Sequence, residues 1–233
     1  MNKLEFRIKK ISHSTGENVD LSAIPMMMRR KLSPIGKIAM STLFDCYGEN
    51  SGDIKLVYAS RYGELERVVK LIKQEHEDNE ISPAGFSFSV HNSTIGLFSL
   101  LKNIHSSYNS VTGGEESFSA GLLDAVMNRE KTLFCYAESV DRYESISILI
   151  DYDEGEKVLV RENSERLPAN SFDEFIQGGR YVCPLYIMER ADDSVCSWIS
   201  CMYGFCNFWH LLVAIKFFVF ADWWNVLAWG AKA

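Results

Sequence analysis

Two amphipathic helical patterns flank a short apolar strand between residues 34 and 77, and this alternation constrains the fold more than any other feature of the chain. Ser33 and Pro34 provide a good N-cap and a good first helical residue, and apolar side chains then recur at helical spacing over 34–47. Residues 54–59 form an apolar run of strand length, and residues 63–77 return to a helical period. This order predicts an α/β fold in which helices are layered on a sheet, as α-β-α.

The remaining pattern extends the same architecture in both directions. On the N-terminal side it predicts a strand over 3–11 and a loop over 12–24. On the C-terminal side it predicts a turn at Ser82–Pro83, a strand near 108–113 and a small-residue helix over 117–126. Strands over 131–137 and 145–152 and a polar, loop-rich segment over 153–180 follow. A short connection joins the last two strands, so we expect them to be antiparallel neighbours. With 233 residues, 47% of them hydrophobic, the chain can bury a sizeable core without a disulfide or a metal.

Charge and cysteine usage exclude several classes of protein. The net charge of −7 argues against a protein whose whole surface binds nucleic acid, because such proteins usually present a basic face. The N-terminal residues lack the apolar core and cleavage site of a secretory signal, so we expect a cytoplasmic protein with reduced thiols. Cys196, Cys201 and Cys206 are spaced five apart, and zinc sites combine closely spaced cysteine pairs with further Cys or His ligands, so packing as small hydrophobic side chains in a core is the favoured interpretation. We therefore expect neither a metal nor a cofactor.

The last forty residues differ in character from the rest and hold all five tryptophans. Phe208–Trp229 is nearly continuous in apolar side chains, but His210, Lys216, Asp222 and Asn225 interrupt it. Lys or Asp near a bilayer centre costs roughly 2.5–3.5 kcal/mol, which argues against a spanning helix. We expect a buried or partner-facing segment, and a membrane-surface helix with peripheral membrane contact stays open as an alternative.

The segment 113–116 combines two glycines with two acids between a predicted strand and a predicted helix. Acids at the start of a helix complement its dipole, which is the structural interpretation of Glu115 and Glu116. The functional interpretation is that Gly113 and Gly114 make a sharp strand-to-helix turn that presents one side chain into a cleft. In that geometry a carboxylate stands where a nucleophile would be.

Other candidate chemistry is weaker. His91 and Cys135 could form a nucleophile pair, but Cys135 lies in the middle of a predicted strand, so we expect a structural histidine and a packed thiol. The cluster Arg29, Arg30 and Lys31 is either a solvated face or a surface that receives an acidic carrier protein. No phosphate-binding loop, dinucleotide-binding glycine motif, zinc-protease motif or serine-hydrolase elbow is present.

Five short motifs follow one another over residues 25–126. They are Pro25–Ser33 (PMMMRRKLS), Ala59–Arg67 (ASRYGELER), Ser82–Pro83, Phe86–Asn92 (FSFSVHN) and Gly114–Leu123 (GEESFSAGLL). Together they resemble the short β-ketoacyl synthase chain-length-factor-like family of aryl polyene biosynthesis. Residues 133–152 fit that family more loosely, and the tryptophan-rich tail matches no family that we can name.

The resemblance implies a thiolase-like fold, similar to the N-terminal half of a ketosynthase. Asn92–Leu100 corresponds to the ketosynthase segment N-M-A-A-G-H-x-S-I, and Gly114–Phe118 then falls on A-C-A-T-G. Glu115 thereby occupies the place of the nucleophilic cysteine, and no cysteine lies between Cys46 and Cys135 to replace it.

A Claisen condensation needs a thiolate that accepts the acyl chain, and a carboxylate cannot hold that chain as a stable thioester. A ketosynthase also uses two histidines from its second half. Here His210 is the only histidine beyond His105. The resemblance therefore implies a subunit that is not catalytic alone.

The resemblance implies that this chain pairs with a full-length ketosynthase, which supplies the cysteine. The complex then acts on polyene intermediates bound to acyl carrier protein. Residues implied at the partner interface or pocket are His91, Asn92, Ile95, Phe98, Glu115 and Phe118, and those of a carrier-protein patch are Arg29, Arg30 and Lys31. Two alternatives stay open: a malonyl-carrier decarboxylase that uses Glu115, and a membrane-associated scaffold. We expect a thiolase-like domain over 1–190 and a hydrophobic extension over 191–233.

Overall fold

The computed structural model describes residues 4–191 apart from 17, 18, 51, 53, 128 and 141. These residues divide into two compact units, which are treated separately below. The larger unit spans 7–155, and the smaller one combines residues 4–6 with the described residues from 156 onward.

The larger unit is built on a mixed sheet with the strand order β3-β2-β4-β5-β1. The strands are β1 (Leu4–Thr15), β2 (Lys55–Ala59), β3 (Tyr108–Val111), β4 (Thr132–Glu138) and β5 (Glu144–Asp151). β2 runs parallel to β3 and β4, with Val57 beside Phe134. β4 and β5 are antiparallel neighbours, as predicted, with Phe134 beside Ile148.

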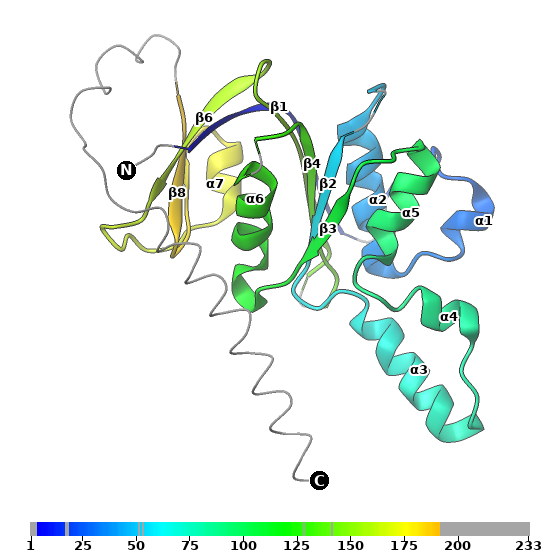
Figure 1. Ribbon diagram of the computed structural model, residues 1–233. Helices are drawn as coiled ribbons and strands as arrows, with labels where there is room; N and C mark the ends of the chain where they lie inside the picture. The colour runs from blue at the N-terminus through cyan, green and yellow to red at the C-terminus, as the bar shows by residue number, and fades with distance from the viewer. Residues whose placement is uncertain are drawn as a thin grey trace. The chain divides into compact units, whose positions relative to one another are not determined.

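Helices cover both faces of this sheet, which confirms the layered α/β fold (Figure 1). On one face α2 (Pro34–Tyr47) and α5 (Ser93–Lys102) pack in the same core cluster as alternate residues of β2 and β4, among them Tyr58 and Cys135. On the other face lies α6 (Ser117–Met127), which contacts β2 and β4.

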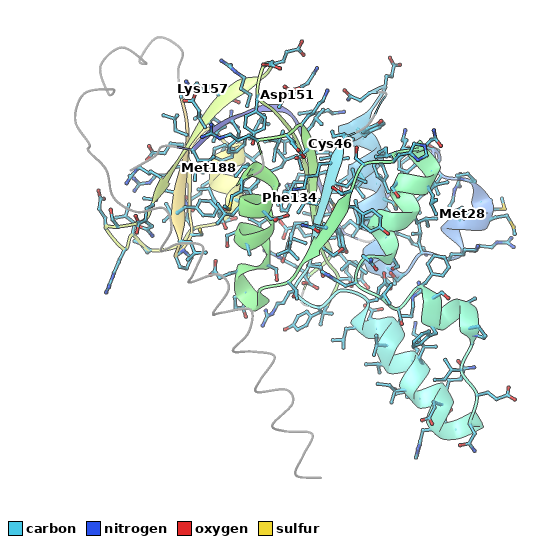
Figure 2. The ribbon with its side chains drawn as sticks, in the orientation of Figure 1. Met28, Cys46, Phe134, Asp151, Lys157 and Met188 are labelled. Atoms are coloured by element: carbon cyan, nitrogen blue, oxygen red, sulfur yellow. The ribbon has the colours of Figure 1, made fainter. Side chains whose placement is uncertain are left out.

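Local sequence explains where α2 begins and how closely α6 approaches the sheet. The Ser33 hydroxyl accepts a hydrogen bond from the Gly36 amide at 3.1 Å, so the predicted N-cap is confirmed. A Cβ atom on Gly121 would lie 2.6 Å from the Ala59 Cβ and 2.8 Å from the Phe134 ring, so only glycine allows this helix to pack against the sheet as it does. Figure 2 labels Phe134, which lies between α6 and the sheet.

A helical hairpin formed by α3 (Leu65–Asp78) and α4 (Pro83–Ser87) extends from the larger unit (Figure 1). None of residues 65–77 is buried, and α4 buries none of its residues. The predicted turn at Ser82–Pro83 is the N-terminus of α4, where the Ser82 hydroxyl accepts from the Gly85 amide at 3.2 Å. A further short helix, α1 (Met26–Arg29), precedes α2.

The smaller unit contains the strands β6 (Glu156–Glu162), β8 (Tyr186–Arg190) and β7 (Arg180–Val182), in that order, and the helix α7 (Phe172–Ile176). An aromatic cluster forms its core, in which the Phe172 ring stacks on Phe175 at 5.3 Å and meets Tyr181 edge-on at 5.6 Å.

Two predictions of loop structure were wrong. Residues 12–15 continue β1 because they pair with β5 as far as Thr15, opposite Glu144. Residues 156–162, expected to be loop, form β6 because their alternating pattern pairs with β8. Polar side chains on the exposed face of this strand concealed it.

The tryptophan-rich tail and Cys196, Cys201 and Cys206 lie outside the described residues, as does all but the first residue of the predicted extension over 191–233. The domain boundary at 190 therefore stays a prediction. Within the part of the chain that the structure describes, no helix combines the length and the apolar character needed to cross a bilayer.

Candidate functional site

The candidate site lies at the edge of the larger unit's sheet where the parallel strands β2, β3 and β4 end. Three connections meet at this carboxyl edge: residues 60–64 after β2, 112–116 after β3 and 139–143 after β4. Ligand sites of open α/β sheets usually form at such an edge, because loops from neighbouring strands converge there.

The predicted strand-to-helix turn is present after β3. Gly114 has φ +60°, in the left-handed region that favours glycine, and it opens a 3-10 turn, η1 (Gly114–Glu116), that leads into α6. The buried Ser117 hydroxyl accepts from the Gly113 amide at 3.0 Å and donates to the Gly114 carbonyl at 2.7 Å. These two hydrogen bonds of Ser117 stabilise the conformation of the turn.

Glu115 lies at the outer side of this turn with 74% of its side chain exposed. Its carboxylate is 2.5 Å from the Arg61 guanidinium, which belongs to the connection after β2. That guanidinium also lies 4.7 Å from the centre of the Tyr62 ring. Exposed ion pairs contribute about 0–1 kcal/mol, so the pair joins two connections at the sheet edge without dominating their stability.

An aromatic wall forms the inner side of the site. The Phe118 ring, at the start of α6, meets Phe134 and Tyr136 edge-on, with ring centres 5.6 Å apart in each case. Burial raises the pKa of the Tyr136 hydroxyl to about 12, so it stays a neutral hydrogen-bonding group. Next along β4, the buried Glu138 carboxylate accepts from the amides of Ser139 at 2.9 Å and Val140 at 3.3 Å.

His91 packs against the connection after β2, next to Gly63. Its ring centre is 5.4 Å from that of Tyr58, and its Cδ2 atom leaves no room for a Cβ on Gly63. Burial lowers the pKa of His91, and a hydrogen bond with the Ser60 backbone partly opposes that shift. Its Nε2 is buried with no hydrogen-bond partner in the described structure. Asn92 is exposed and stands at the N-terminus of α5, with no side-chain hydrogen bond to the helix.

Ile95 and Phe98 differ from the expectation that they face a partner. Both side chains are fully buried, and the Phe98 ring meets Phe44 edge-on at 5.4 Å and Tyr47 at 5.7 Å. As interface residues these two predictions were wrong, because α2 of the same chain covers this face of α5. Leu100, on the opposite side of α5, is the exposed apolar residue of the helix.

The three described cysteines, Cys46, Cys135 and Cys183, are all buried. Burial raises the pKa of the Cys46 thiol to about 12, and it also raises that of Cys135. The Cys135 sulfur lies 3.7 Å from the Ser145 hydroxyl, on the face of the sheet that α2 covers. None of these thiols offers an accessible thiolate, so a nucleophile pair of Cys135 and His91 has no support.

The three residues of the basic cluster, Arg29, Arg30 and Lys31, differ in their contacts. Arg29 donates to the carbonyl oxygens of Ile24 at 2.5 Å and Ser22 at 3.0 Å, so its guanidinium holds the preceding loop. Arg30 and Lys31 are exposed.

Sequence reasoning missed Arg61, Tyr136 and Glu138 as parts of the site. Arg61 lies two residues after the end of a buried strand, and a charged residue in that position is the signal that could have indicated it. Tyr136 and Glu138 carry no such signal, since they look like ordinary residues of a buried strand.

Comparisons with known proteins identify the family and agree with the fold. The profile of the β-ketoacyl synthase N-terminal domain family matches residues 7–134, which fall inside the larger unit. A solved chain from the complex of the ketosynthase ApeO with its chain length factor ApeC, from Xenorhabdus doucetiae, is 20% identical with a TM-score of 0.64. That match covers 80% of this chain and 100% of the solved one.

The ishigamide ketosynthase/chain length factor is 15% identical over 58% of this chain and 50% of that one, with a TM-score of 0.46. No curated protein matches the sequence. Because the family profile covers more than half of the residues, the chain belongs to the β-ketoacyl synthase N-terminal domain family.

Proposed function

We propose that this chain is a non-catalytic, chain-length-factor-like subunit that pairs with a full-length β-ketoacyl-acyl-carrier-protein synthase in aryl polyene biosynthesis. The observation that carries the proposal is Glu115, a carboxylate at the strand-to-helix turn where the ketosynthase resemblance calls for a thiolate. The buried state of the described cysteines supports it, since none can replace that thiolate.

The chemistry of the turn fits a supporting role. Condensation needs a nucleophile that forms a thioester and then releases the acyl group to a carbanion. The Glu115 carboxylate is bound to Arg61 at the surface and has no thiol beside it in the described structure. The partner ketosynthase therefore supplies the cysteine, and this chain shapes the space in which the polyene grows.

The edge of the sheet supports a paired state. β3 leads into the turn and pairs only with β2 among the described strands, so its other edge carries unpaired backbone groups. In the thiolase-like fold that the sequence resembles, dimers form alongside this strand. The similar solved chain belongs to a ketosynthase–chain length factor complex.

Cations around the Phe88 ring, of which Lys31 is exposed and Arg67 half-buried, support an acidic carrier protein as the second partner. The Lys31 ammonium lies 5.7 Å and the Arg67 guanidinium 5.9 Å from the centre of the Phe88 ring, and Arg30 is exposed nearby in sequence. Carrier proteins present acidic helices, which a basic patch with an aromatic centre attracts. The complex then acts on polyene intermediates bound to the carrier protein.

Co-expression with a full-length ketosynthase from the same organism tests the proposal. The two proteins should co-purify 1:1, whereas this chain alone should aggregate or associate with itself. Condensation should vanish when the ketosynthase cysteine is alkylated, and it should survive Cys135→Ala here. A stable monomer that ignores the ketosynthase, or condensation by this chain alone, would contradict the proposal.

A further inference from the structure

The short helix α1 exposes two methionine side chains beside the basic cluster. We infer that Met26 and Met27, called the α1 methionine pair here, are an oxidation site, and that the sulfoxide of Met26 binds the Arg30 guanidinium and so weakens the attraction of an acidic carrier protein. The effect on the carrier protein rests on the proposed function, whereas the oxidation site does not.

Exposure distinguishes this pair from the other methionines. Met26 is 65% exposed and Met27 is 69% exposed. The remaining described methionines are buried or half-buried: Met28, Met40, Met127 and Met188. A thioether reacts with a peroxide only where the peroxide reaches its sulfur, so among the methionines that the structure describes we expect the α1 methionine pair to react first.

The next two residues of α1 anchor the helix. Met28, labelled in Figure 2, packs against the core cluster that α2 and α5 share with the sheet. The Arg29 guanidinium donates to the carbonyl oxygens of Ile24 at 2.5 Å and Ser22 at 3.0 Å. Because Met28 and Arg29 fix this single helical turn, the fold itself keeps the α1 methionine pair at the surface.

The Met26 sulfur lies against a cation. Nη2 of Arg30 is 3.9 Å from this sulfur, because residues four apart on a helical turn are neighbours. A thioether sulfur is only a weak acceptor. The contact therefore leaves the exposed Arg30 guanidinium able to attract other anions while Met26 is reduced.

Oxidation turns this contact into a strong hydrogen bond. The Met26 sulfur attacks hydrogen peroxide, so that an S–O bond forms and the O–O bond breaks. The leaving hydroxide takes up the remaining peroxide proton and departs as water, and the sulfur loses the two electrons that the peroxide gains. The new sulfoxide oxygen is a polar acceptor within reach of Arg30, and hydrogen bonds from a guanidinium to such oxygens are short and strong.

This hydrogen bond changes the surface that a carrier protein would meet. Arg30 and Lys31 are both exposed, and the Lys31 ammonium lies 5.7 Å from the centre of the Phe88 ring. A cation at an interface attracts an acidic partner less once it is bound to a neighbouring acceptor. Oxidation also replaces an apolar side chain by a polar one beside these cations. Because methionine sulfoxide is reduced enzymatically, the pair acts as a reversible switch.

Peptide mass spectrometry of the full-length chain tests the oxidation site. After brief treatment with dilute hydrogen peroxide, fragmentation of the tryptic peptide that ends at Arg29 should locate one added oxygen on Met26 and one on Met27. Met28 lies in the same peptide and is the internal control, which should stay reduced. Oxidation of Met28 as fast as its two neighbours would overturn the site.

Variants that keep an apolar side chain test the coupling to Arg30. Met26→Leu removes the sulfur that contacts Arg30, and Met27→Leu on the same helical turn is the matched control. The affinity of each full-length chain for the acyl carrier protein of the same organism is measured by biolayer interferometry before and after peroxide treatment. Oxidation should weaken binding several-fold in the wild type and in Met27→Leu, and a methionine sulfoxide reductase should restore it. Met26→Leu should be unaffected, and an equal loss in that variant would overturn the coupling.

A measurement without the carrier protein separates this inference from the proposed function. In NMR spectra of the isotope-labelled chain, the side-chain N–H signals of Arg30, assigned with Arg30→Lys, should shift on oxidation of the wild type and stay in place in Met26→Leu. If the reduced chain does not bind the carrier protein, the proposed carrier partner and the effect on its affinity both fail, and the Arg30 signals decide the switch alone. Unchanged Arg30 signals after oxidation of Met26 would overturn the inference.

Discussion

At the scale of the residue, His91 is a half-buried imidazole with a predictable effect on stability. Its pKa lies below the ordinary value of 6.5 because burial disfavours the charged ring. Above pH 6.5 the ring is neutral in both the folded and the unfolded chain, so it adds no pH dependence. As pH falls below 6.5 the unfolded chain binds a proton that the folded chain resists, and stability is lost until the lower, folded pKa is passed.

The measurement is the free energy of unfolding at pH 7.5 and pH 5.0, obtained by urea denaturation. His91→Gln should make the fall between the two pH values shallower than in the wild type. His76→Gln, at an exposed position of α3, is the matched control and should keep the wild-type difference. Equal pH dependence in all three proteins would show that burial does not restrain protonation of His91.

At the scale of the element, Gly121 sets the distance between α6 and the sheet. A Cβ there would approach the Ala59 Cβ to 2.6 Å, closer than real Cβ contacts, so Gly121→Ala must displace the helix or the strand. Overpacking of this kind costs about 1–3 kcal/mol, and the midpoint of urea denaturation should fall accordingly.

Gly96 in α5 provides the matched control for that change. Its Cβ would lie 3.4 Å from the Tyr108 hydroxyl, which is ordinary contact. Alanine is the better helix former by about 1 kcal/mol, so Gly96→Ala should leave stability unchanged or raise it. If both substitutions have the same effect, close packing of α6 is not what requires glycine.

At the scale of the whole molecule, Glu115 distinguishes a shaping subunit from an enzyme. In the complex with the ketosynthase, Glu115→Ala should preserve condensation within a few-fold, because it removes only an exposed ion pair with Arg61. The measurement is the rate of polyene extension by the purified complex. A loss of a hundredfold or more with assembly unchanged would favour malonyl decarboxylation by Glu115, and replacing the ketosynthase cysteine is the control that should abolish turnover.

Much of the larger unit was predictable because its signals are local. The N-cap at Ser33, the period of 34–47 and the glycine pair before Glu115 depend on neighbours in the chain, and the structure has the predicted helix and turn there. β6 escaped prediction because its exposed face is polar, and only its pairing with β8 makes it a strand.

The sequence by itself determined the layered α/β fold and placed a carboxylate rather than a thiol at the turn, since both follow from residue order and helix and strand periods. Tertiary structure alone decided which apolar stripes are covered. Phe98 and Ile72 both lie on apolar helical stripes, yet α2 buries the first and nothing described covers the second. It also brought Arg61 to Glu115 across 54 residues of sequence. A periodic pattern states that a helix has an apolar face, but the element that meets this face comes from a distant part of the chain or from another molecule.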